Sequence, residues 1–575
     1  MTDPTWTSVR VPGFALGEAT DAYAAAAETA RDEEWATRLF DRDATRWSDD
    51  PDVQAAIGDR LGWLDAPEEF ADKIAALEGF GDGIVAAGFT TAVVAGMGGS
   101  SLAPDVLRRT FGTQDGYLDL RILDSTDPTA VAAVFDDLDP LRTLVIIASK
   151  SGTTTEPNAF LEYTWDRAHK ALDKVGHHAY ETPGAMIAAI TDPGRSLEAI
   201  PHHDDFREVF LNPPDIGGRY SALTYVGLVP ASLIGLDLDA LLASALAMLG
   251  ACREPDPALN PGVSLGVAMG TLAQAGRDKL TFLADDEIAS FGAWAEQLIA
   301  ESTGKQGVGI VPVDLEPLGA PAAYGPDRAF VRLSLAGGTD GGRDALADAL
   351  EAAGHPVIRI EIADPIDLGG EFVRWEVATA ISGAILGIDP FDQPNVEEAK
   401  NLTREVLAKA GRGEALQTGA APLTPSDPAL ADALAAHLQK RAPNAYLALQ
   451  AFIAPTPARD EALARIRALL RDRTRQATTA GYGPRFLHST GQLHKGGAPI
   501  GWFLQLTADH PDDREIPGWP YTFGRLIDAQ AAGDFAALDG HGLPILRIHL
   551  GADPDVGLAA LEIALDAALS TILED

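Results

Sequence analysis

The chain has little cysteine and little positive charge. Cys252 is the single cysteine among 575 residues, so the sequence offers neither a disulfide framework nor a cysteine-based metal site, as is usual in a reducing compartment. Lysine and arginine total 44 against 84 aspartates and glutamates, which gives a formal net charge of −40. This charge argues against nucleic acid and anionic membranes as partners. An anionic substrate would therefore need a locally basic pocket.

Long apolar runs are also missing. No segment approaches the roughly 18 apolar residues of a membrane span, and the first residues lack a charged-then-apolar signal pattern. Hydrophobic residues make up 46% of the chain, as expected for a soluble globular protein. The length predicts about three or four packed units. We therefore expect a cytoplasmic protein.

Strand-like and helical patterns alternate through the middle of the chain. From Thr91 onward the strands TAVVAG, LRILD, LVIIAS and MIAAITD are separated by helical stretches. This alternation is typical of parallel sheets covered by helices. The sequence predicts an α/β fold with two doubly wound parallel-sheet domains, over residues 89–255 and 256–402. A helical segment over residues 1–88 precedes them.

The remaining residues have a weaker pattern. Residues 403–475 are rich in Ala, Leu and Arg at helical spacing and predict a helical insertion or connector. The segment GLPILRIHLGADP at 542–554 resembles GHPVIRIEIADP at 354–365, and each precedes an apolar helical stretch. This echo predicts a partial third α/β unit over residues 476–575, although common strand composition can produce such a match by chance.

One apolar strand runs directly into a hydroxyl-rich loop. Residues 144–148 form a continuous apolar run, and Ser149, Lys150, Ser151 and Thr154 follow it around a glycine. A predicted helix begins next, and the free N–H groups and positive dipole at its start favour an anion. The alternative is a helix cap rich in Ser and Thr that binds no ligand.

A second loop has the same position relative to its strand. Gly99 and Ser100 follow TAVVAG and precede a helix, which is where open α/β sheets bind ligands. The segment GMGGSS is not the GxGxxG dinucleotide fingerprint. Because two such loops on one sheet can converge on a single anion, the pair predicts a phosphate site.

Three other segments contain residues suited to acid–base chemistry. Gln297 and Glu301 are four residues apart in a predicted helix, so their side chains leave one face. Arg219 lies in a glycine-rich turn. Gln393 precedes Lys400 by seven residues, two turns along a predicted helix. Taken singly, each of these also fits an ordinary cap or a solvated side chain.

Five motifs in order resemble the phosphoglucose isomerase family, which has paired α/β domains of the sugar-isomerase (SIS) type. They are GMGGSSLAP, SKSGTTTE, GGRYSALT, EQLIAESTGK and DPFDQPNVEEAK, and the resemblance covers roughly residues 30–405. The segments GMGGSSLAPDVL, ESTGK with GIVPV, and LHSTGQLHKGG are most similar to the isomerase half of transaldolase–phosphoglucose isomerase fusions.

The resemblance implies interconversion of glucose 6-phosphate and fructose 6-phosphate without a metal or organic cofactor. Glu301 would move a proton between C1 and C2, Arg219 would stabilise the cis-enediolate, and Lys400 would assist ring opening. The implied substrate-binding residues are Gly99, Ser100, Ser149, Lys150, Ser151, Thr154, Gln297 and Gln393. Lys150 would contribute through its backbone.

One departure from the family concerns the histidine that opens the sugar ring. The family has it shortly after the base, whereas no histidine follows Glu301 in the corresponding segment. The loop LHSTGQ is similar to the histidine loop of bacterial members, which makes His488 the candidate and His494 the second choice. The usual members are dimers that share this histidine across subunits. A histidine supplied within one chain would remove that requirement, so we expect a monomer or a homodimer.

Two other functions fit parts of the pattern. One is a broader sugar-phosphate isomerase that also accepts mannose 6-phosphate. The other is a sugar-phosphate sensor that keeps the phosphate loop but performs no turnover. A sensor has no need of a proton-transfer carboxylate, so Glu301, Arg219 and Lys400 together favour an enzyme.

Overall fold

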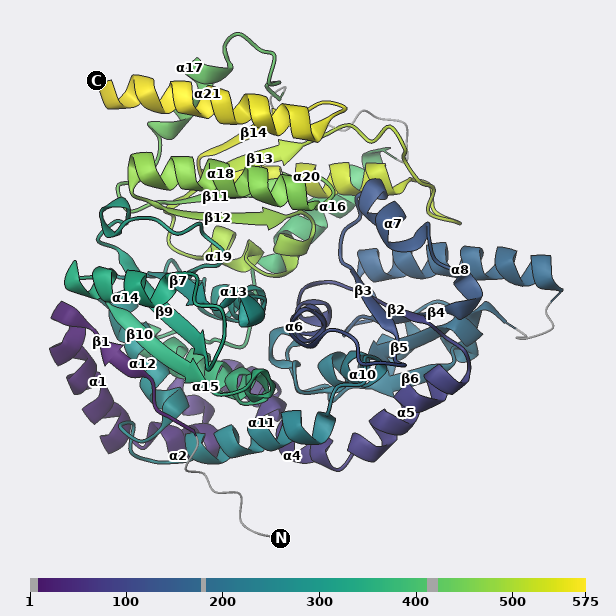
Figure 1. The fold of residues 1–575 in the computed structure, drawn as a ribbon, viewed down its shortest axis with the longest axis horizontal. Coiled ribbons are helices and arrows are strands. Elements are labelled where there is room, and N and C mark those ends of the chain that lie inside the picture. Colours follow the sequence, from purple (N-terminus) through teal and green to yellow (C-terminus); the bar gives the residue numbers. More distant parts are fainter. Residues whose placement is uncertain (1–8, 177–181, 411–421, 575) are drawn as a thin grey trace.

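Three mainly parallel sheets organise the chain (Figure 1). The computed structural model describes residues 9–176, 182–410 and 422–574. The strand orders are β3-β2-β4-β5-β6, β1-β10-β9-β7-β8 and β12-β11-β13-β14. In each sheet the chain moves from an inner strand to one neighbour and then crosses to the other side, which is a doubly wound topology. The predicted α/β fold with two doubly wound parallel sheets is confirmed, and a third sheet repeats the same winding.

The first sheet consists of apolar strands with helices between them. Its inner strands, β2, β4 and β5, are buried at every position, as expected for parallel strands covered on both faces. The strands are β2 (Thr91–Gly96), β3 (Asp119–Leu123), β4 (Thr143–Ala148), β5 (Ile187–Thr191) and β6 (Glu208–Leu211). The helices are α6 (Leu102–Phe111), α7 (Pro128–Phe135), α8 (Thr155–Val175), α9 (Arg195–Glu198) and α10 (Tyr225–Leu233).

The second sheet lies beside the first and shares a continuous apolar core with it. Its strands are β7 (Lys279–Ala284), β8 (Val311–Val313), β9 (Arg328–Leu335) and β10 (Val357–Ile362). Its helices are α11 (Leu238–Cys252), α12 (Pro261–Gln274), α13 (Phe291–Thr303), α14 (Arg343–Ala352) and α15 (Leu368–Leu386).

The N-terminal segment is helical with one exception. Its helices are α1 (Thr20–Asp32), α2 (Trp35–Phe40), α3 (Pro51–Gly58), α4 (Ala66–Ala71) and α5 (Ile74–Ala86). Strand β1 (Gly13–Ala15) precedes them and pairs antiparallel with β10 at the edge of the second sheet. The prediction of a helical segment over residues 1–88 is therefore wrong at β1, because three residues are too few to show a strand period. Residues 1–8 of that segment lie outside the described part of the chain.

The third unit begins earlier than the sequence indicates. Strand β11 (Tyr446–Phe452) lies inside the predicted helical connector, residues 403–475, and forms an inner strand of the third sheet. That prediction is wrong here because a fully buried run of Ala and Leu has the composition of a helix as well as of a strand. Residues 411–421 of the connector lie outside the described chain.

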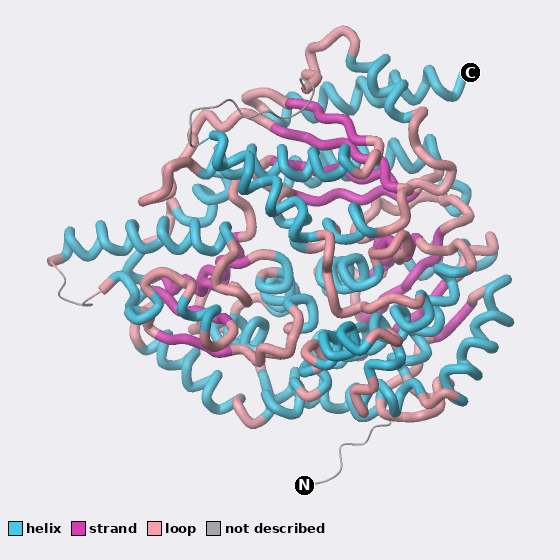
Figure 2. Tube along the Cα trace, turned by 180° about the vertical axis from the view of Figure 1, so that it is seen from behind, coloured by secondary structure: helices cyan, strands magenta, loops and turns pink. Residues whose placement is uncertain are grey.

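The other elements of the third unit surround this strand. The strands are β12 (Ala477–Tyr482), β13 (Gly501–Thr507) and β14 (Ile545–His549). The helices are α16 (Val396–Ala410), α17 (Leu430–Leu438), α18 (Pro457–Thr474), α19 (Gly491–Gly496), α20 (Phe523–Gly540) and α21 (Pro554–Glu574). In Figure 2, which shows the molecule from behind, the strands form three separate groups.

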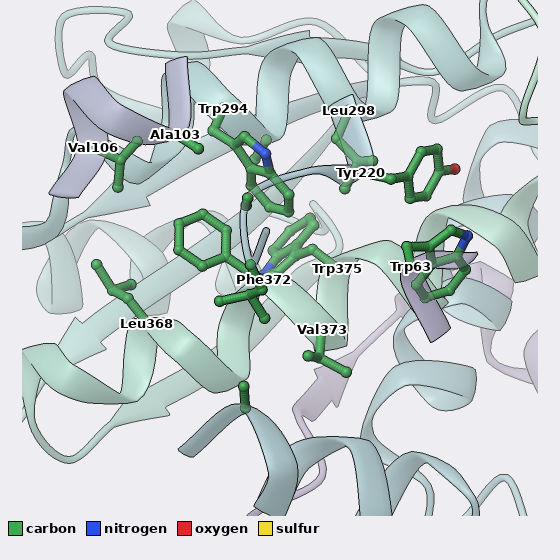
Figure 3. Packing of buried hydrophobic residues seen from close by; sticks show 14 of the residues in the cluster. Trp63, Ala103, Val106, Tyr220, Trp294, Leu298, Leu368, Phe372, Val373 and Trp375 are labelled. Atoms are coloured by element: carbon green, nitrogen blue, oxygen red, sulfur yellow. The ribbon is translucent and has the colours of Figure 1, made fainter. Parts of the chain in front are cut away.

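Aromatic packing fixes helix α13 between the sheets. Trp294 packs edge-on against Phe372 of α15, with ring centroids 4.7 Å apart, and Trp375 lies close by (Figure 3). Both tryptophans are fully buried. Burying side chains of this size stabilises the folded protein by several kcal/mol, and the specific ring contacts add to this. Helix α13 is therefore held rigidly. The polar residues of the same helix are thereby fixed in place.

Arginine side chains attach the third unit to the second. Arg467 of α18 donates to the carbonyls of Asp314 and Leu315 at 2.8 and 3.0 Å, and Arg475 donates to the carbonyl of Tyr324 at 3.0 Å. Arg471, between them at helical spacing, donates to the carbonyl of Pro317. The irregular segment after β8 thus receives donors for its backbone from α18 and from the residue that follows this helix, as buried carbonyls require.

The third unit is expected to lose stability in acid because of His437. This histidine is 3% exposed, its Nε2 lies 2.9 Å from the carbonyl of Phe503, and burial lowers its pKa from 6.5 to about 4. Between those values the unfolded chain binds more protons, so stability falls as pH drops from 7 to 4. A shift of this size corresponds to about 3 kcal/mol.

Urea unfolding at pH 7 and pH 4.5 tests this, with His437→Gln as the variant. Glutamine keeps a donor for the carbonyl of Phe503 but takes up no proton. We expect the variant to lose less unfolding free energy between the two pH values than the wild type. An equal loss in both proteins would contradict the assignment.

Candidate active site

Helix α13 presents a glutamine and a glutamate on one face. Glu301 is 8% exposed near the end of the helix, and its Oε2 accepts a hydrogen bond from Nε2 of Gln297 at 3.0 Å. The same Nε2 donates to the backbone carbonyl of His488 at 2.8 Å. Gln297 therefore joins the candidate base to the loop that carries the candidate histidine, within one chain.

Arg219 supplies a fixed cation beside Glu301. It lies in η9 (Gly218–Tyr220), and its Nη1 is 3.6 Å from Oε1 of Glu301 and 3.0 Å from Oε1 of Gln393. Its Nε donates to Ser302 at 2.7 Å, and its Nη2 donates to the carbonyls of Pro390 and Asp392. Because its donors are bound on several sides, the guanidinium is held in one orientation.

Three loops converge on this pair. The turn η5 (Gly98–Ser100) approaches η9 so closely that a Cβ on Gly99 would lie 2.2 Å from the carbonyl of Gly218. Gly98 has a φ of +55°, and a Cβ there would lie 2.3 Å from the carbonyl of His488 in η13 (Arg485–His488). The glycines therefore permit backbone contacts that a side chain would block. Ser100 is half-buried at the end of η5.

The predicted phosphate loop follows β4, the neighbour of β2 in the sheet. Ser149 Oγ donates to Thr154 Oγ1 at 3.1 Å, and Ser151 Oγ lies 3.0 Å from Thr153 Oγ1. Gly152 has a φ of +66°, and a Cβ there would lie 1.8 Å from the carbonyl of Ser196. The loop ends at the N-terminus of α8, as the sequence predicts.

The side chain of Lys150 points to a neighbouring pair of loops. Its Nζ donates to Oδ2 of Asp192 at 2.6 Å and to the carbonyl of Pro214 at 2.8 Å. These residues follow β5 and β6. A contribution from Lys150 to the predicted anion site would therefore come from its backbone.

A cavity of about 190 Å³ adjoins the phosphate loop. Helix α16 contributes Lys400 and Arg404, four residues apart, and η13 contributes His488. The lining residues are Ser151, Thr153, Thr154, Thr155, Glu156, Val396, Lys400, Thr403, Arg404, Leu407, Leu487, His488, Leu526 and Gln530. Hydroxyls and cations thus share one pocket in a chain of strongly negative charge.

The predicted residues fall into two adjoining groups. Glu301, Arg219, Gln297 and Gln393 form a bonded cluster, whereas Ser151, Thr154, Lys400 and His488 line the cavity. His488 connects the groups, through its backbone carbonyl to the first and through its side chain to the second. The serines and glycines at positions 99, 100 and 149 belong to the loops around these groups and do not line the cavity itself.

The sequence does not single out Glu156. Its Oε1 accepts from Nε2 of His488 at 3.1 Å and from Nε2 of Gln530 at 2.6 Å. Burial raises the pKa of this carboxyl, but the charge and hydrogen bond of His488, a backbone hydrogen bond and the charge of Lys400 together hold it below its usual range. An acidic residue in the first turn of a helix is common, so no local signal distinguishes it.

The second choice for the ring-opening histidine, His494, has a different role. It is buried among Phe503, Phe486 and Tyr446, with ring centroids 5.1, 5.9 and 6.1 Å away. Burial lowers its pKa well below the usual value. His494 is a core residue of the third unit, and the cavity lining does not include it.

The fold and the site together define an α/β protein with a hydroxyl-rich pocket, also lined by Lys400 and Arg404, beside a carboxylate–arginine pair. The family model for phosphoglucose isomerase matches residues 40–325. A glucose-6-phosphate isomerase of Rubrobacter xylanophilus is 31% identical over 414 residues, which cover 63% of this chain and 93% of that protein. This chain belongs to the phosphoglucose isomerase family.

One more relative and two solved structures are also similar to this chain, and the two structures show the fold. A glucose-6-phosphate isomerase of Symbiobacterium thermophilum is 29% identical over 61% of this chain and 87% of its own. The crystal structure of a hypothetical protein of Thermus thermophilus matches with a TM-score of 0.56 at 24% identity, covering 69% of this chain and all of that one. A Chlamydia trachomatis glucose-6-phosphate isomerase structure matches with a TM-score of 0.50 at 19% identity, over 67% of this chain and 85% of its own. The particular similarity to transaldolase fusions stays a prediction.

Within the described ranges, no helix combines the length and the apolar composition that crossing a bilayer needs.

The close approach of η5 and η9 makes Gly99→Ala a direct test of the site geometry. The added methyl group would collide with the carbonyl of Gly218 and displace the turn that holds Arg219. Overpacking of this kind costs about 1–3 kcal/mol. We expect a lower melting temperature by circular dichroism. Gly79→Ala in α5, where nothing lies within 4 Å, is the control and should leave the melting temperature unchanged or raised. Equal melting temperatures for both variants would contradict the contact.

Proposed function

We propose that the protein interconverts glucose 6-phosphate and fructose 6-phosphate, a step of glycolysis and gluconeogenesis, in the cytoplasm and without a cofactor. The observation that carries this proposal is the bridge formed by Gln297. It connects a carboxylate–arginine pair suited to enediolate chemistry with the loop of His488 at a phosphate-type pocket.

The phosphate is proposed to bind at the N-terminus of α8. Hydroxyls of Ser151 and Thr154 and the backbone around Lys150 would donate to it, and Lys400 lines the same cavity. The positive end of the helix dipole adds to this attraction. Binding the phosphate away from the reacting carbons orients the sugar, so that binding energy serves catalysis. The sugar would then extend past His488 toward Glu301, along Gly99 and Ser100.

Ring opening requires a proton to leave the C1 hydroxyl and another to reach the ring oxygen as the bond between C1 and that oxygen breaks. We assign this exchange to His488, with assistance from Lys400. Glu156 supports the assignment, because a carboxylate that accepts from Nε2 of the imidazole fixes the ring and its tautomer.

Glu301 then takes the proton from C2 of the open aldose and returns it to C1, while the hydroxyl proton of O2 passes to O1 and the ketose carbonyl forms at C2. The intermediate is a cis-enediolate, whose negative oxygen requires a nearby cation. Arg219 meets that need at 3.6 Å from the carboxylate, already oriented by its other hydrogen bonds. Gln297 and Gln393 are proposed to position sugar hydroxyls.

A coupled assay of fructose 6-phosphate conversion in the presence of EDTA tests the reaction, with Glu301→Gln as the variant. Glutamine preserves the shape of the side chain but cannot carry the proton. We expect robust wild-type turnover that falls by at least about a hundredfold in the variant, the scale of a lost acid–base group.

The matched control is Glu562→Gln, which removes a surface carboxylate paired with Arg465 and should leave turnover unchanged. Wild-type protein that binds sugar phosphates without turning them over would support the sensor instead. Competition by mannose 6-phosphate in the same assay distinguishes the broader isomerase.

A complete site within one chain is the second testable feature. We expect Glu301→Gln and His488→Gln to be inactive separately and to stay inactive when the two variants are co-expressed with different tags and purified together. If subunits shared these residues, mixed dimers would assemble one intact site and regain part of the wild-type activity. Such recovery would contradict a site formed in cis and would require a dimer.

A further inference from the structure

A glutamine from the third unit contacts the carboxylate that pairs with His488. Gln530 lies in α20, and its Nε2 donates to Oε1 of Glu156 at 2.6 Å. Its own Oε1 accepts from the hydroxyl of Thr126 at 2.6 Å. The three side chains are buried, with exposures of 5% for Glu156, 3% for Gln530 and 0% for Thr126. This row of hydrogen bonds runs from the first sheet to the third unit.

The orientation of the Gln530 amide follows from its neighbours. An ionised carboxylate only accepts hydrogen bonds, so the NH₂ group of Gln530 must face Glu156. The amide oxygen then faces Thr126, whose hydroxyl donates to it. Reversing the amide would place two acceptors together in a buried site, which costs the full desolvation of both.

Next to Gln530, helix α20 is held in place by two polar side chains of the third sheet. Gln505 of β13 and Arg547 of β14 are paired in register. Both donate to the carbonyl of Ala531, each at 3.0 Å. Ala531 is the residue next to Gln530. One turn further along, Asp534 pairs with Lys495 at 2.7 Å, and both side chains are almost completely buried. Buried polar contacts of this kind specify position, because an unmatched arrangement would leave charges unpaired.

The contact has a chemical consequence for His488. Since Glu156 accepts from its Nε2, that nitrogen carries a proton, and in the neutral imidazole Nδ1 is left with the lone pair. A donor on Glu156 stabilises the ionised form of the carboxylate in a buried setting. Gln530 thereby helps to keep Glu156 charged and His488 in a single tautomer.

We propose that Gln530 is a positioning residue for the ring-opening step, through which the third unit sets the charge state of the Glu156–His488 pair. The inference rests on the proposed function only for the identity of that step. The hydrogen-bonded row itself reaches residues beyond the match to the family model, which ends at residue 325.

Other groups around Glu156 bear on any pH measurement. Among the described residues, Lys400 of α16 acts on it as a positive charge, and Tyr521, which precedes α20, has its pKa raised to about 12 by burial and by the charge of Glu156. His488 is the directly bonded titratable partner. Gln530 is the neutral group whose removal changes the hydrogen bonding without changing the net charge.

The test is Gln530→Met, which keeps the length of the side chain and removes both hydrogen bonds. One readout is the pH dependence of kcat/KM for fructose 6-phosphate. The other is the ¹³Cε1 signal of His488 in histidine-labelled protein, identified by its absence in His488→Gln. We expect the acid limb of the rate profile and the acid midpoint seen at this signal to move to higher pH by about half to one unit, the equivalent of one lost hydrogen bond. The signal reports on Glu156 even if the protein performs no isomerisation.

Gln476→Met is the matched control, because Gln476 is a buried glutamine of the same unit that donates to the carbonyls of Ala442 and Pro443. It should lower stability to a similar extent and move neither readout. Thr126→Val is a smaller change and should move both readouts in the same direction by less. If Gln530→Met does not fold, the shift in Thr126→Val tests the proposal instead. Unchanged midpoints in the variants that fold, or the same shift in Gln476→Met, would overturn the proposal.

Discussion

The amide of Gln297 makes the contact on which the site depends. One nitrogen donates both to Glu301 and to the backbone carbonyl of His488, which is 191 residues away in sequence. That geometry requires α13 to be rigid, and the packing of Trp294 on α15 provides the rigidity. It also requires the loop after β12 to reach α13, and the arginines of α18, together with Arg475 just after it, hold the third unit close enough. The apolar core and the buried polar contacts therefore both hold Gln297, Glu301 and the loop of His488 in contact.

Much of this arrangement can be read from the sequence, because it depends on local patterns. Buried strands such as β2 and β4 are continuous apolar runs, and a glycine such as Gly99 marks a place where two backbones meet. Glu301 and Gln297 share a helix face by spacing alone. The ordered motifs then predict the family correctly.

The remainder depends on contacts that have no local signature. Glu156 and Gln530 are 374 residues apart, and each by itself is an ordinary polar residue of a helix. The direction of Lys150 is decided by Asp192, which lies on a different loop. Strand β11 is built from residues that also favour helices, and only its place between β12 and β13 makes it a strand. In each case the local sequence is compatible with more than one contact or secondary structure, and the tertiary structure selects one of them.

The location of η13 in the same chain as α13 also has a meaning in terms of effective concentration. A side chain supplied by a second subunit is lost on dilution, to an extent set by the dissociation constant of the dimer. Here the imidazole of His488 is tethered to the chain that carries Glu301, so its local concentration does not depend on the amount of protein. Local opening of the third unit would move the imidazole of His488 away from Glu301. The free energy that holds α18 and α20 in place therefore limits how often the site is incomplete.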